Sequence, residues 1–233
     1  DMINAGVGFD NAPARSGSPT ASSIILVTPD AARSMNTCLG ASIEFEVADL
    51  ESANARAAKV IYLEGYLFDA PNGPAIFNEA ARLAHRHGAK VALSLSDPWC
   101  AERHRAPLRD FTAKHVSILF GNEEEVASLY QCEVNNAISV LSDTIEEVVV
   151  TRGPKGAFVG DRKNSYEIPA MPQGAVIDTT GAGDWFAAGY LFGRTNSFDL
   201  LQSGRLASLA AGEIISHIGA RPKINLKGLS EGL

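Results

Sequence analysis

The chain has 233 residues, of which 45% are hydrophobic and 20% are charged, and its formal net charge is −7. This composition suits a globular protein with a sizeable core, whereas the negative charge argues against a nucleic-acid partner, which would require clustered lysine and arginine. No apolar run approaches the roughly 20 residues of a membrane helix. Three widely spaced cysteines favour a reduced, cytoplasmic setting.

Two short extended segments come first, residues 22–27 (SSIILV) and 33–39 (RSMNTCL), and the turn-like TPDAA joins them. Alternating strand residues around Pro and Asp predict a β-hairpin. Arg33 on this hairpin could reach a ligand if the hairpin acts as a lid, although such a residue is more often simply solvated.

From residue 49 onward, apolar segments alternate with helical periods. The predicted strands span residues 60–66, 91–97, 117–122 and 147–153, and the predicted helices span 74–87, 101–114 and 123–130 continuing to 141. Strands that are apolar on both faces require helices on both sides, so the pattern predicts an α/β fold with a mainly parallel sheet.

The remainder of the chain predicts a second hairpin at residues 156–171, a short β-like stretch that ends at Asp178, and helices at 181–194 and 200–217. We expect a small lid region at residues 1–48 and an α/β core at 49–233.

The segment DTTGAGDWFAAG, residues 178–189, places a glycine turn and Asp184 at the start of a helix. First-turn N–H groups lack intrahelical acceptors, so glycines that allow close approach would form an anion site there. The structural alternative is a tight turn with a carboxylate that favours a helix N-terminus. No Walker A string occurs, Phe186 occupies the third glycine position of a dinucleotide fingerprint, and no nucleophile sits at the turn. An anion hole beside a carboxylate suits phosphoryl transfer to a hydroxyl.

Two further segments follow predicted strands. Asn122 and Glu125 have N-x-x-E spacing, which is typical of a helix capping box but would also face a ligand crevice at the end of a parallel strand. There they could arrange water and Mg²⁺ around a triphosphate. The segment TRGPKG, residues 151–156, reads either as a hairpin turn or as exposed backbone along which a nucleotide lies.

Together, DTTGAGDWF, NEEE and TRGPKG resemble, in this order, the signatures of the ribokinase-like or PfkB carbohydrate kinase family. The resemblance runs from about residue 20 to 222, and RSMNTCLGA and SHIGARP are most similar to its adenosine-kinase-like branch. It implies a three-layer α/β/α fold with a small β lid near the N-terminus, ATP and Mg²⁺ as cofactors, K⁺ as an optional one, and a sugar or nucleoside as substrate. A homodimer through the β lid is also consistent with it.

The resemblance assigns roles to matching positions. Asp184 would be the catalytic base, and the anion hole would consist of Gly181, Ala182 and Gly183. Asn122 and Glu125 would organise Mg²⁺, with Glu125 acting through water. Residues 49–233 would form a nucleotide-binding core, in which three residues would contact ATP: Thr151, Gly153 and Gly156. Small residues at 207–211 would leave room for an adenine ring, although helix packing explains them equally well. Asp178 and Thr180 would help bind a monovalent cation, to which the carbonyls of residues 216–219 could contribute.

The leading function is therefore an ATP-dependent kinase that acts on a primary hydroxyl of a sugar or nucleoside. A catalytically silent nucleotide-binding module of the same fold is the alternative, and an NAD-dependent dehydrogenase is disfavoured by Phe186. Nothing in residues 1–20 resembles the family's sugar-holding glycine-glycine motif, so we expect the chain to lack an N-terminal portion.

Overall fold

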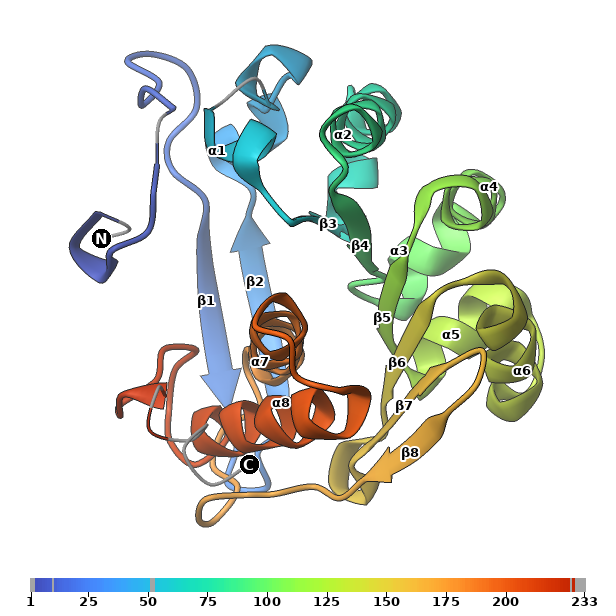
Figure 1. Cartoon of the computed structure of the whole chain (residues 1–233). Coiled ribbons are helices and arrows are strands. Elements are labelled where there is room, and N and C mark those ends of the chain that lie inside the picture. The colour runs from blue at the N-terminus through green and yellow to red at the C-terminus, as the bar shows by residue number, and fades with distance from the viewer. Residues whose placement is uncertain (1–2, 10, 51–52, 227, 229–233) are drawn as a thin grey trace.

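The computed structural model describes residues 3–9, 11–50, 53–226 and 228, and these residues form an α/β fold (Figure 1). Its strands are β1 (Ser22–Val27), β2 (Arg33–Cys38), β3 (Val60–Glu64), β4 (Lys90–Ser94), β5 (Ile118–Asn122), β6 (Glu147–Thr151), β7 (Ala157–Asp161) and β8 (Ser165–Ile168). Its helices are α1 (Ala53–Ala57), α2 (Gly73–His87), α3 (Pro98–Arg103), α4 (Arg105–His115), α5 (Glu123–Tyr130), α6 (Val134–Thr144), α7 (Ala182–Thr195) and α8 (Leu200–Ile214).

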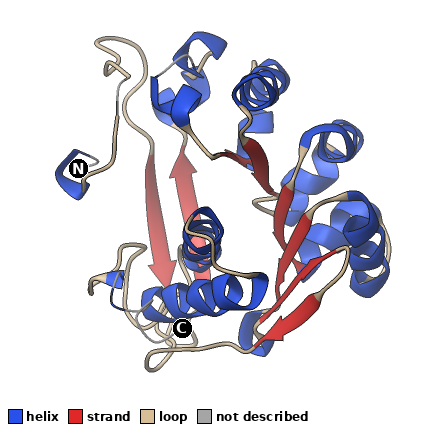
Figure 2. Cartoon of the chain, in the orientation of Figure 1, coloured by secondary structure: helices blue, strands red, loops and turns tan. Residues whose placement is uncertain are grey.

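The central sheet has six strands in the order β3-β4-β5-β6-β7-β8 (Figure 2). The strands from β3 to β6 pair in parallel, and β7 and β8 continue the sheet in antiparallel pairs. The predicted, mainly parallel sheet and the second hairpin are therefore confirmed. Because the first four strands run parallel in sequence order, their carboxyl ends meet at one edge, where ligands bind in open α/β sheets.

Helices cover both faces of this sheet, which makes the fold a three-layer α/β/α arrangement. Val148 and Val150 of β6 point into a core that includes residues of α2, α4, α5 and α6, while Val149 points into the core beneath α7 and α8. This alternation follows from the two-residue side-chain period of a strand. A strand that buries both faces must be largely apolar, as Val148, Val149 and Val150 of β6 are.

Two predicted helices are each divided in the structure. The helix expected at residues 101–114 is interrupted at His104, because Pro107 cannot donate a hydrogen bond and its ring would clash with the carbonyl four residues earlier. The helix expected to continue from Glu123 to residue 141 ends at Tyr130. Gln131 follows in a left-handed conformation (φ 54°), and α6 starts anew at Val134. The prediction of a single helix was wrong in both places.

Residues leading to Asp178 do not form the predicted β-like segment. They run beside the end of α8, and the N–H of Ile177 donates to the carbonyl of Ile215 at 2.8 Å. Helix α8 ends at Ile214, three residues before the predicted end. A Cβ atom on Gly189 of α7 would lie 2.8 Å from Cα of Ala207. The small residues of α8 therefore serve close helix packing at this point.

Strands β1 and β2 form the predicted hairpin, which stands apart from the six-stranded sheet (Figure 1). The side chains of Ile24 and Leu26 on β1 are 69% and 60% exposed. Within the described ranges, no helix combines the length and apolar character that crossing a membrane would demand.

Candidate active site

The carboxyl edge of the parallel strands gathers polar side chains from distant parts of the chain. Glu64 at the end of β3 pairs in register with Ser94 at the end of β4, and Asn122 of β5 pairs with Thr151 of β6. Asp184, in the first turn of α7, lies close enough to Glu64 for the two charges to interact. The structure thus brings three sequence-predicted residues to the edge where a ligand would lie.

The glycine turn has the geometry of a helix entrance that can accept an anion. Gly181 is the N-cap of α7 with φ 80°, and a Cβ there would approach that of Ala220 to 3.0 Å, so both backbone and space require glycine. A Cβ at Gly183 would meet nothing within 4 Å. The N–H of Ala182 donates to Thr179 at 3.2 Å. The N–H groups of Gly183 and Asp184 have no intrahelical acceptor, so they are the donors of this turn that are available to an anion.

The carboxyl group of Asp184 occupies a site that favours a bound proton. The pKa of Asp184 is raised, first because the surrounding protein removes part of its hydration and second because the negative charge of Glu64 lies nearby. The residue remains accessible to solvent. A reachable carboxylate with a raised pKa is a suitable proton acceptor for a hydroxyl.

Asp178 holds the turn together from beneath. One carboxylate oxygen accepts hydrogen bonds from the N–H of Thr180 at 2.9 Å and from its hydroxyl at 2.6 Å, and the other accepts from the N–H of Gly219 at 3.0 Å. Burial alone would raise the pKa of Asp178, but these donors and nearby Arg33 outweigh it and lower the pKa. Asp178 is therefore ionised and buried, and its hydrogen bonds stabilise the glycine turn.

The N-x-x-E segment forms the capping box that its spacing predicts. The side chain of Asn122 accepts from the N–H of Glu125 at 2.8 Å, and that of Glu125 accepts from the N–H of Asn122 at 2.9 Å. Glu125 is only 7% exposed. Its burial, followed by the charges of Asp97, Glu64 and Glu124, raises its pKa to about 7 against the opposing hydrogen bond from Asn122.

The two glycines of TRGPKG have different environments. A Cβ on Gly156 (φ 91°) would lie 1.9 Å from the carbonyl oxygen of Ile168, so this glycine is required by the turn between β6 and β7. A Cβ on Gly153 (φ 55°) would meet nothing within 4 Å. The hairpin interpretation therefore accounts fully for Gly156, whereas the backbone at Gly153 is open to a ligand.

One residue at the site, Glu64, did not stand out in the sequence. Glu64 accepts a hydrogen bond from the hydroxyl of Ser96 at 2.8 Å, and its charge acts on Asp184. The only sequence signal for it was its position as the last residue of a mostly apolar strand. Arg33, for which the sequence left open both a ligand contact and simple solvation, donates a hydrogen bond to the hydroxyl of Thr179, so the hairpin places a cation at the glycine turn.

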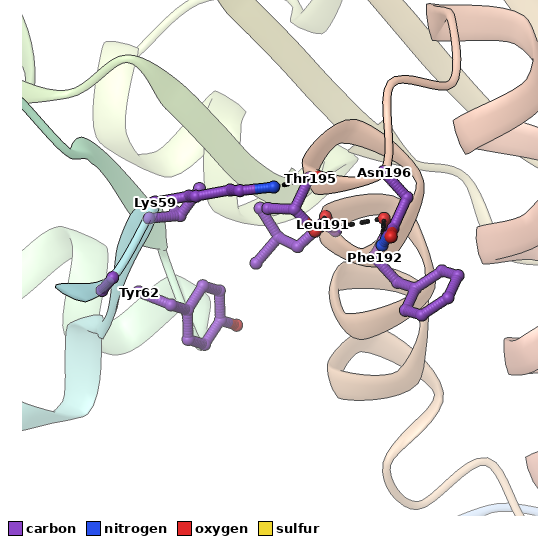
Figure 3. A pocket seen from close by; sticks show the side chains of 8 residues that line it. Lys59, Tyr62, Leu191, Phe192, Thr195 and Asn196 are labelled. Atoms are coloured by element: carbon purple, nitrogen blue, oxygen red, sulfur yellow. Dashed lines mark hydrogen bonds between the residues drawn. The ribbon is translucent and has the colours of Figure 1, made fainter. Parts of the chain in front are cut away.

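A groove beside α7 lies away from the glycine turn. A groove of about 430 Å³ runs between β3 and α7, with Lys59 and Tyr62 on one wall and Phe192 and Thr195 on the other (Figure 3). The ammonium group of Lys59 donates to the carbonyl of Thr195 at 2.7 Å. Because Thr195 is the last residue of α7, the groove lies at the opposite end of that helix from the glycine turn.

The carboxyl edge of the sheet carries the carboxylates of Glu64, Asp97 and Glu125 and the open backbone of Gly183. Within the described ranges, no group of three or more His, Cys, Asp or Glu side chains is arranged to hold a metal ion. The negative charges of Asp97 and Glu64 both act on Glu125. Carboxylate oxygens are ligands that Mg²⁺ prefers. The open backbone at Gly183 leaves room for a phosphate.

Comparisons with known proteins agree with this fold. A model of the pfkB family carbohydrate kinases matches residues 1–226. A probable sugar kinase from Rhizobium etli has a TM-score of 0.95 and 38% identity over 100% of this chain and 71% of its own. An adenosine kinase from Sinorhizobium meliloti has a TM-score of 0.94 and 38% identity over 99% and 71%. An uncharacterized sugar kinase from Archaeoglobus fulgidus is 29% identical over 182 residues, 77% of this chain and 69% of that protein. Five other curated kinases are covered over 36% to 55% of their lengths.

Proposed function

The chain belongs to the pfkB family of carbohydrate kinases, phosphotransferases with an alcohol group as acceptor, and we propose that the protein transfers the γ-phosphate of ATP to a primary hydroxyl of a sugar or nucleoside. The observation that carries this proposal is the placement of Asp184. Its carboxylate lies in the first turn of α7, beside free N–H donors and next to Glu64. The adenosine kinase and sugar kinase relatives support the acceptor class.

In this proposal Asp184 accepts the proton of the acceptor hydroxyl as phosphoryl transfer begins. The raised pKa makes the carboxylate a better base than an ordinary aspartate. The N–H groups of Gly183 and Asp184, at the positive end of the α7 dipole, stabilise negative charge on the transferred group. Phosphoryl transfer depends mainly on position and charge, and both are supplied at this helix entrance.

Arg33 completes the proposed phosphate site from the lid side. It contacts Thr179, three residues before Ala182 at the start of α7, and its guanidinium can pair with phosphate oxygens in a fork geometry. A hairpin that carries such a cation would exclude water from the turn when it closes. We also propose that residues 1–48 form the lid region and residues 49–233 form the kinase core.

The proposed roles of the remaining site residues follow from their positions. Asn122 and Glu125 would hold the water shell of Mg²⁺, which supplies charge neutralisation for the triphosphate when bound. Thr151 and Gly153 would contact the nucleotide, while Gly156 keeps the turn closed. Asp178 and Thr180 would adjoin a K⁺ site. Since three donors already occupy the Asp178 carboxylate, only its remaining lone pairs could take part.

The exposed outer side chains of β1 favour a second proposal about assembly. Ile24 and Leu26 form an apolar face that pairing of two lids would cover. Light scattering on wild type and on Leu26→Lys measures this directly. A dimer that becomes a monomer supports pairing through the lid, and an unchanged mass in both proteins contradicts it.

The function is tested on the full-length protein with a coupled ADP-release assay against a panel of sugars and nucleosides with ATP and Mg²⁺. We expect turnover with at least one acceptor and a loss of about 10²–10⁴ in turnover for Asp184→Asn, at nearly unchanged nucleotide affinity. Nucleotide binding without turnover on any acceptor would favour the catalytically silent module. Near-normal turnover of Asp184→Asn would contradict the assignment of the base.

A further inference from the structure

A buried carboxylate near the end of α8 has no role in the proposed chemistry. Glu213 is 3% exposed, and one of its oxygens is buried without a hydrogen-bond partner among the described residues. The other oxygen contacts Nε2 of His217 at 3.2 Å and accepts a hydrogen bond from the N–H of Lys223 at 2.9 Å. Burying a half-satisfied carboxylate costs stability, so its presence requires an explanation.

The groups that Glu213 holds belong to one short segment, residues 216–223, which we call the strap. His217 lies near the start of the strap and Lys223 is its last residue, so the carboxylate joins both ends to α8. The hydroxyl of Ser216 also donates to the carbonyl of Glu213 at 2.6 Å. The strap is thus closed into a loop whose two ends share a single buried anchor.

The middle of the strap contacts the glycine turn at three points. The N–H of Gly219 donates to Asp178 at 3.0 Å, and the carbonyl of Ala220 accepts from Nε1 of Trp185 at 2.9 Å. The side chain of Ala220 packs where a Cβ on Gly181 would lie 3.0 Å away. These contacts lie on both sides of the anion-facing N–H groups of Gly183 and Asp184.

We propose that Glu213 and His217 are positioning residues of the active site, which act by holding the strap against the 178–185 turn. The carboxylate fixes the ends of the strap, and the strap in turn fixes Asp178 and Trp185 around the anion hole. Loss of the anchor would let the turn shift, and small displacements of catalytic groups reduce rates strongly. This inference rests on the proposed kinase function, but its first readout is independent of activity.

The test uses the full chain in a Trp99→Phe background, so that Trp185 is the remaining tryptophan. Glu213→Ala is compared with Glu213→Gln, which keeps an oxygen for the Lys223 N–H, and with Ser208→Ala. Ser208 is a matched control because it is also buried on α8 but donates to Pro169, outside the strap. His217→Leu leaves the Lys223 bond in place and serves if Glu213→Ala does not fold.

We expect Glu213→Ala and His217→Leu to shift Trp185 emission to the red, increase its acrylamide quenching and lower kcat by roughly 10- to 10²-fold with little change in KM for ATP. Glu213→Gln should restore emission and rate. Emission and kcat no different from those of Ser208→Ala would overturn the proposal, as would a changed emission at unchanged kcat. If wild type turns over no acceptor, the kinase proposal fails, and the fluorescence comparison alone then decides whether Glu213 holds the strap.

Discussion

Substitution of Glu125 by glutamine separates its capping role from its proposed role near Mg²⁺. Glutamine can serve a capping box, and the chain itself shows this at α8, where Gln202 accepts from the N–H of Asp199 at 3.1 Å and donates its own N–H back at 2.8 Å. Capping is therefore preserved in Glu125→Gln. What the substitution removes is the buried charge.

The raised pKa of Glu125 sets the sign of the pH dependence of the free energy of unfolding. The pKa of Glu125 is about 7 in the folded protein against a usual 4.5, so the folded state retains a proton that the unfolded state loses. Below pH 4.5 the carboxyl group is neutral in both states and costs nothing. As the pH rises to 7 and above, the free energy of unfolding of the wild type falls by up to roughly 3 kcal/mol. This follows from 1.36 kcal/mol for each unit of pKa difference between the folded and unfolded states.

Urea unfolding of both proteins between pH 4.5 and 8 measures this difference. We expect the free energy of unfolding of Glu125→Gln to exceed that of wild type increasingly as the pH rises. Mg²⁺ with ATP should then stabilise wild type more than the variant, and the variant should need more Mg²⁺ for turnover. A pH-independent difference would refute the burial argument, and identical Mg²⁺ titrations would leave Glu125 with capping alone.

Three further substitutions, two of them with a comparison variant, test the glycine turn, the arginine of the hairpin and an ion pair at the far end of α7. Gly183→Ala should raise the free energy of unfolding by up to about 1 kcal/mol, because a methyl group there meets open space in a helix. The same substitution should lower turnover. Gly181→Ala should instead lower the melting temperature. Unchanged turnover in Gly183→Ala would contradict a phosphate at this turn. Arg33→Ala should lower kcat/KM by roughly 10- to 10²-fold without changing the melting temperature, whereas Arg162→Ala, an exposed control, should not. Arg194→Leu should cost about 3 kcal/mol in urea unfolding, because Glu147, which it contacts at 2.8 Å, remains buried. A smaller loss would mean that Tyr190 and Lys90, which also contact Glu147, satisfy this carboxylate without Arg194.

The local features of this protein were readable from its sequence, because each depends on residues within about one helical turn. The entrance of α7 at Gly181 follows from a glycine that can adopt positive φ before a run of helix-forming residues. The capping box of Asn122 and Glu125 follows from a three-residue spacing. The strands from β3 to β6 were identifiable because a strand buried on both faces carries a run of apolar residues at its centre.

Only the tertiary structure decided which residues far apart in the sequence come into contact at the site. Glu64 and Asp184 are 120 positions apart, and their proximity depends on the packing of α7 over the end of β3. The contact of Gly219 with Asp178 depends on where the strap returns after α8, and that of Arg33 with Thr179 on where the hairpin stands. Such contacts leave no periodic trace in either partner, because a hydrogen bond between distant segments constrains their spatial separation and leaves their spacing along the chain free.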